Sequence, residues 1–150
     1  MENMSNDVFF ALSILEGASR YTGCPLKELI DYVKDSDLEY LIKNAQVFHC
    51  DESSYTIKLL VDTCNIPNGN RVIEGYNIPS YWTQGRSFWR IIGKFVSYEE
   101  DSMETIISEI RKFMKSVVAE YMSDYRTWFY WAPSNYLVDC YKENKILVND

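Results

Sequence analysis

The sequence predicts an all-α protein, folded as a single compact bundle of about six to seven helices. Two observations predict this class. Apolar residues recur at steps of three and four in several segments, which is the period of a helix with one buried face. The segments are joined by connections of a few residues, and a chain of 150 residues with 47% hydrophobic and 25% charged residues fits one globular domain.

The stretch 101–122 has the clearest helical period, and we expect it to form the central amphipathic helix of the bundle. Asp101 followed by Glu104 fits a capping box, which would mark the start of this helix. Polar and charged residues occupy its other side, so the helix covers a core and does not cross a membrane. Its apolar face consists of Met103, Ile106, Ile107, Ile110, Phe113, Met114, Val117, Val118 and Tyr121.

Residues 1–66 are expected to form a four-helix N-terminal subdomain. Gly23 suits the end of the first helix, and the polar run 65–70 suits the end of the fourth. The predicted helices run from Asp7 to about Tyr21, from Pro25 to Val33, from a cap at Ser36 or Asp37 to Phe48, and from a cap at Ser53 or Ser54 to Cys64.

Residues 71–150 are expected to form an aromatic-rich helical segment that packs on the first half, giving one domain overall. The piece 71–81 has no helical period and is predicted to be a loop. Trp82 to Val96 is predicted to be a helix in which Gly85 and Gly93 require a reason such as close helix approach. The run 125–131 is a turn or short irregular helix, and a last helix opens at Pro133 or Ser134.

Charge and aromatic residues are distributed unevenly along the chain. Residues 1–70 carry 5 basic and 11 acidic side chains, whereas residues 71–150 carry 10 and 11, so the first half holds most of the net charge of −7. A field of that sign repels phosphate backbones and anionic lipids, which disfavours nucleic-acid and membrane partners. Residues 71–150 also hold 16 of the 23 aromatic residues and all four tryptophans.

No pattern of catalytic, metal-binding or cofactor-binding residues is found in the sequence. The cysteines form no C-x-x-C pair and predict a reduced, cytoplasmic protein; they are Cys24, Cys50, Cys64 and Cys140. The lone His49 lacks the ligand spacing of zinc sites, and we expect it to hydrogen-bond near a helix end. The glycines fit no phosphate-binding motif. We therefore predict no catalytic residues, no metal and no cofactor.

The run Trp128, Phe129, Tyr130 and Trp131 is the candidate partner-binding site. Most of these rings could belong to the core, but so many large rings in a short run are hard to bury, and exposed Trp and Tyr are favoured at protein interfaces. The leading hypothesis is a non-enzymatic, cytosolic protein-interaction module. Because the second half is close to neutral, a homodimer through Trp128 or Trp131 is expected.

The alternative function is that of a small anionic-ligand-binding protein or enzyme. Arg86, Arg90 and Lys94 recur at steps of four beside Trp82 and Trp89, so they could hold an anion next to aromatic rings. The competing interpretation is a solvated helix face whose arginines meet the acidic first half.

Two stretches resemble a widespread bacterial family of small helical proteins of unknown function. The first is residues 38–50, an aliphatic helix that ends near His49; the second comprises residues 78–92 with residues 124–136 and the pair Tyr141-Lys142. Some members of that family are encoded near toxin-like proteins, including ADP-ribosyltransferase-like ones. The resemblance implies a partner-binding, accessory or antitoxin-like role, and it supplies no catalytic residues.

Overall fold

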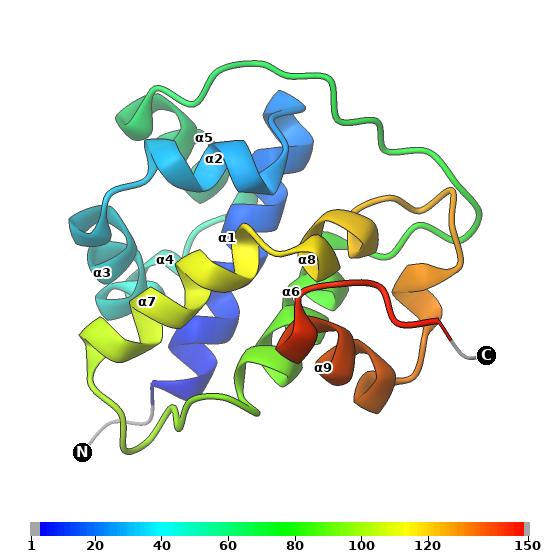
Figure 1. Cartoon of the computed structure of the whole chain (residues 1–150). Helices are drawn as coiled ribbons and strands as arrows, with labels where there is room; N and C mark the ends of the chain where they lie inside the picture. The colour runs from blue at the N-terminus through cyan, green and yellow to red at the C-terminus, as the bar shows by residue number, and fades with distance from the viewer. Residues whose placement is uncertain (1–3, 149–150) are drawn as a thin grey trace.

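The computed structural model describes residues 4–148 and confirms the predicted all-α class (Figure 1). The described residues form helices and connections without a strand, and their buried apolar side chains form one core that draws on both halves of the chain. None of the helices in this part of the chain is long and apolar enough to span a membrane. The helices are α1 (Ser5–Thr22), α2 (Leu26–Tyr32), α3 (Asp35–Lys43), α4 (Ala45–Phe48), α5 (Ser53–Cys64), α6 (Tyr81–Ile92), α7 (Met103–Met114), α8 (Val117–Met122), the 3-10 turn η1 (Phe129–Trp131) and α9 (Ser134–Glu143).

The helix at the centre of the bundle is α1, drawn in blue in Figure 1. It packs against α2, α3, α4, α5 and α6. Every residue from Phe10 to Ser19 is buried, including the polar Ser13 and the charged Glu16. A helix that is buried all round lies inside a protein, whereas an amphipathic helix covers one face of it. The helix predicted over 101–122 is amphipathic and covers one face of the core, so it does not occupy the centre.

The prediction of one continuous helix over 101–122 is wrong, because α7 ends at Met114 and α8 begins at Val117. Ser116 separates the two helices: its extended backbone breaks the turn, and its hydroxyl accepts a hydrogen bond from the Ala119 amide at 3.2 Å. A serine with this geometry is an N-cap, which starts a new helix.

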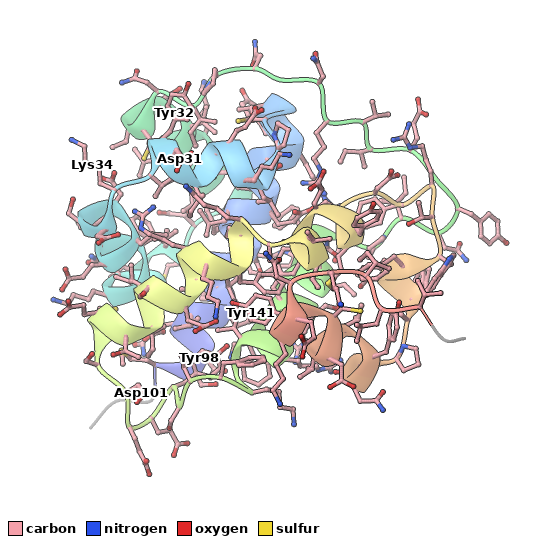
Figure 2. All side chains as sticks on the ribbon, in the orientation of Figure 1. Asp31, Tyr32, Lys34, Tyr98, Asp101 and Tyr141 are labelled. Atoms are coloured by element: carbon pink, nitrogen blue, oxygen red, sulfur yellow. The ribbon has the colours of Figure 1, made fainter. Side chains whose placement is uncertain are left out.

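The predicted capping box is also wrong. Ser102 is the N-cap of α7, and its hydroxyl accepts a hydrogen bond from the Thr105 amide at 3.1 Å. Asp101 lies on the connection before α7, where its carboxylate accepts a hydrogen bond from the Ser97 amide at 2.7 Å (Figure 2).

The other predicted helices are present with changed ends. The third one is divided at Asn44 into α3 and α4, and Lys34 takes the N-cap position with Asp37 accepting from its amide at 3.0 Å. The helix predicted from Trp82 ends at Ile92. The close helix approach predicted at Gly85 is confirmed. A Cβ at this position would lie 2.8 Å from the Cα of Ser13, so only glycine allows α6 to lie this close to α1.

The long connection 65–80 between α5 and α6 runs over the outside of the molecule, in green in Figure 1. It is attached to the end of α1 by backbone hydrogen bonds, from Gly69 to the Thr22 carbonyl at 3.0 Å and from Arg71 to the Gly23 carbonyl at 2.7 Å. Gly69 is required at this contact, because a Cβ there would lie 2.6 Å from the Gly23 oxygen.

Candidate functional site

The turn η1 positions the four residues that the sequence singled out for partner binding. Trp131 and Ala132 donate backbone hydrogen bonds to the carbonyls of Trp128 and Phe129, at 2.9 and 3.1 Å. Phe129 and Tyr130 point into the protein and are only 3% and 7% exposed. These two residues therefore belong to the core, and they anchor the turn without being available to a partner at the surface.

The two tryptophans of this run are exposed. Trp128 is 64% exposed and Trp131 is 59% exposed. The hydrogen-bonded turn sets these residues three positions apart, a spacing at which side chains eclipse one another in ideal 3-10 geometry. The run is thus divided: Phe129 and Tyr130 belong to the core, whereas Trp128 and Trp131 are exposed, and their role in an interface stays a prediction.

Two tyrosines extend this exposed region. Tyr136 of α9 lies 6.1 Å from Trp128 between ring centroids, and Tyr121 of α8 packs on Phe129 at 5.7 Å. Tyr121 is exposed, and Tyr136 is half-buried with its hydroxyl donating to the Leu147 carbonyl at 2.6 Å. We call Tyr121, Trp128, Trp131 and Tyr136 the aromatic surface.

The segment that leads into η1 is held by a local ion pair. Both carboxylate oxygens of Asp124 accept hydrogen bonds from the Arg126 guanidinium, at 2.9 and 3.1 Å. These hydrogen bonds hold the pKa of Asp124 below its ordinary value. The charges at this edge of the aromatic surface are therefore paired with each other.

The four residues predicted for anion binding do not line one site. Trp82 packs in an aromatic cluster with Phe9 and Phe10, at 6.1 and 5.9 Å between ring centroids. Arg86 and Trp89 border a cavity of about 390 Å³. Trp89 and Arg90 border a different cavity, of about 490 Å³, on the other side of Trp89.

In the described part of the chain, the basic residues of α6 and of the turn after it form no ion pair with the acidic first half. Within residues 4–148, none of Arg86, Arg90 and Lys94 has a carboxylate within salt-bridge distance, and the Arg86 guanidinium instead lies 4.7 Å from the centre of the Phe9 ring. The sequence interpretation in which these arginines meet the acidic first half predicted ion pairs between them. That part of the interpretation is wrong for the described residues.

His49 has a packing role in the structure. Its ring lies 4.4 Å from the Phe10 ring and is stacked at 5.9 Å on Trp82. The described hydrogen bonds include none from the His49 ring, so the predicted hydrogen bond near the helix end is not found. Among residues 4–148, no group of three or more His, Cys, Asp or Glu side chains is placed to hold a metal ion.

A buried ionic cluster around Glu16 was missed by sequence reasoning. The Glu16 carboxylate is 0% exposed and accepts two hydrogen bonds from the Arg71 guanidinium, at 2.7 and 2.9 Å. Arg20 donates to it at 2.7 Å and the Tyr125 hydroxyl at 3.2 Å. One feature of the sequence could have indicated it. Glu16 is the sole charged residue between Asp7 and Arg20, in a run of otherwise apolar and small residues, and a charge buried in such a helix needs a partner.

The cluster changes the titration of its members. Burial lowers the pKa of Arg71, but the adjacent Glu16 carboxylate outweighs it, so the pKa lies above its ordinary value. Burial and then Glu16 raise the pKa of the Tyr125 hydroxyl. Arg71 and Tyr125 come from the 65–80 connection and from the segment after α8, so the cluster joins these segments to α1 and is structural.

Comparisons with protein-family models, with curated proteins and with solved structures returned no match to this chain. The resemblance to bacterial helical proteins therefore stays a prediction.

Proposed function

We propose that the protein is a non-enzymatic interaction protein that binds through the aromatic surface, and that its partner is a second copy of the same chain. The observation that carries the proposal is the exposure of the two tryptophans at the ends of the turn, Trp128 at 64% and Trp131 at 59%. Trp and Tyr are the residues most enriched at binding hot spots. Here they are fixed by the buried Phe129 and Tyr130, so little side-chain freedom is lost on binding.

The exposed area is sufficient for an interface centre. An aromatic side chain buries about 150–250 Å² when fully covered, so the two tryptophans together leave roughly 300 Å² in water. Tyr121 adds to this area, since it is 45% exposed. A region of this size equals the largest apolar patches of monomeric proteins, which are often functional.

Charge favours a second copy as the partner. The second half of the chain, which carries the aromatic surface, has 10 basic and 11 acidic residues, whereas the first half has 5 and 11. Two copies that meet through the second half keep their acidic halves apart, and a two-fold axis would place the same four rings of each copy against one another.

The test is the mass of the protein in solution, measured by light scattering coupled to size exclusion at tens of micromolar. We expect twice the 17.7 kDa of one chain. The double variant Trp128→Ala, Trp131→Ala should elute as a monomer that still unfolds cooperatively, without the dependence of the unfolding temperature on concentration that a dimer shows. Tyr76→Ala is the matched control, because Tyr76 is 84% exposed on the 65–80 connection.

A mass near 17.7 kDa for the unmodified chain would refute the homodimer. A dimer that survives the double tryptophan replacement would instead show that another surface joins the two copies.

A further inference from the structure

The cavity of about 490 Å³ beside Trp89 lies where the end of α6, the start of α1 and the start of α9 meet. One wall is rigid. The rings of Trp89 and Tyr98 are stacked, with their centroids 5.7 Å apart and an angle of 6° between their planes. The Tyr98 hydroxyl donates a hydrogen bond to the Trp89 carbonyl at 2.6 Å (Tyr98 in Figure 2). The Trp89 indole nitrogen donates to the Ser5 carbonyl at 3.1 Å, which fixes the start of α1 at the same wall.

Two cations stand on another side of this cavity. Arg90 near the end of α6 and Lys94 in the turn after it are both exposed, and both line the cavity. Neither forms an ion pair with any residue in the range 4–148. Glu99 is the one carboxylate that lines the cavity, so the two basic side chains outnumber it.

The backbone adds to this positive field. Ser5 is the first residue of α1 and Ser134 is the first residue of α9, and both line the cavity. The N-terminus of a helix carries a partial positive charge. Two helix starts and two cationic side chains therefore line one space, and both cations come from the half of the chain that lacks the large excess of acidic residues.

The size of the cavity indicates the kind of anion. Small-molecule sites have volumes of about 300–1,000 Å³, and a bare inorganic anion would leave most of this space empty. We propose that the cavity binds a small phosphorylated organic molecule, with Arg90 and Lys94 at its phosphate and the Trp89–Tyr98 pair beside its organic part. Arginine suits phosphate because its planar guanidinium can donate two parallel hydrogen bonds.

This site is independent of the proposed dimer surface, because it shares no residue with the aromatic surface. The two proposals are also tested by different measurements, mass in solution for one and ligand affinity for the other. Either one can fail while the other stands.

The experiment is isothermal titration calorimetry of the full chain at constant ionic strength, with adenosine monophosphate, glucose 6-phosphate and inorganic phosphate as probes. Adenosine and glucose are the uncharged controls. The variant Arg90→Gln, Lys94→Gln removes the two cations, and Lys34→Gln, Lys58→Gln is the matched control, because it removes two exposed lysines from the first half. Glu99→Gln removes the opposing carboxylate.

At least one phosphate monoester should bind more tightly than inorganic phosphate and than its uncharged control. Its affinity should fall by about 10-fold or more in the Arg90, Lys94 variant, because hydrogen bonds to charged groups are lost. The affinity should be unchanged in the matched control and should rise in Glu99→Gln. All five replaced positions are exposed, and far-UV circular dichroism verifies that each variant is folded.

Three results would overturn the proposal. The first is the absence of binding by the unmodified chain up to about 10 mM of either monoester. The second is an equal loss of affinity in the matched control, which would indicate a general charge effect. The third is equal affinity for inorganic phosphate and both monoesters, which would show that the organic part of the ligand makes no contribution to binding.

Discussion

Replacement of Arg71 by methionine should destabilise the protein strongly. Arg71 has a side chain that is 6% exposed, and it supplies two of the hydrogen bonds to the fully buried Glu16 carboxylate. Removal of one partner of a buried ion pair costs about 3–5 kcal/mol, because the other charge stays in a place without water. Total stabilities are about 5–15 kcal/mol, so the loss is a large part of the whole.

The measurement is urea unfolding followed by far-UV circular dichroism, together with a thermal melt. At this chain length 1 kcal/mol corresponds to about 2–4 °C, so the midpoint should fall by about 6–20 °C. The matched control is Lys43→Met, which breaks the exposed ion pair of Lys43 with Glu39 at 2.7 Å. An exposed pair within a helix contributes only about 0.3–0.5 kcal/mol.

A double variant decides whether the charge left behind is the cause. Glu16→Met with Arg71→Met removes both charges, and such apolar replacements of buried pairs are often neutral or stabilising. Arg20 keeps its hydrogen bonds to the Pro79 carbonyl and the Tyr125 hydroxyl, both at 2.7 Å. The double variant should therefore be more stable than Arg71→Met alone. If it loses at least the sum of the two single effects, the reasoning from a buried carboxylate that keeps only Arg20 as a cationic partner is refuted.

Two further predictions concern the core and the cysteines. Ile110→Asp places a carboxylate at a fully buried position of α7 and should abolish cooperative thermal unfolding, so a retained sharp melt would contradict the assigned core. Burial, and then the Asp37 carboxylate, raise the pKa of Cys64 from 9.0 to about 12. The folded protein therefore holds the thiol proton more tightly than the unfolded chain does. The stability that this thiol contributes is present below pH 9.0 and is lost as the pH rises towards 12. Iodoacetamide at pH 8 should therefore modify the exposed Cys50 well before Cys64, and equal rates by mass spectrometry would contradict this.

The helical class and most helix positions could be predicted because they depend on local signals. The period of apolar residues, Gly23 with its left-handed backbone at φ 79° and the polar run after Cys64 all act within a few residues. The break at Ser116 could not be distinguished from a helix interior, because the apolar period continues through it and serine is tolerated in either place. The central position of α1 could not be predicted, because it depends on which other helices pack on each side of α1, and these come from distant parts of the sequence.

The candidate site was predictable in part for the same reason. The aromatic run at 128–131 is visible in the sequence, but the division between buried Phe129 and Tyr130 and exposed Trp128 and Trp131 follows from the 3-10 turn. The cavity beside Trp89 combines α6 with Ser5 and Ser134, which are distant in the sequence. No local pattern relates these segments.

The ionic cluster at Glu16 has a consequence for how the protein is made. On the ribosome, Glu16 is synthesised 55 residues before Arg71 and 109 residues before Tyr125. Until those residues emerge, Arg20 is the one cation of the cluster beside this carboxylate and water must take the place of Arg71 and Tyr125, so α1 cannot be fully enclosed in the nascent chain. The α6 segment, which packs against Ser13 of α1 through Gly85, also emerges only after the first five helices. Final closure of the bundle is thus postponed until nearly the whole chain has been translated, and contacts this distant in sequence form slowly.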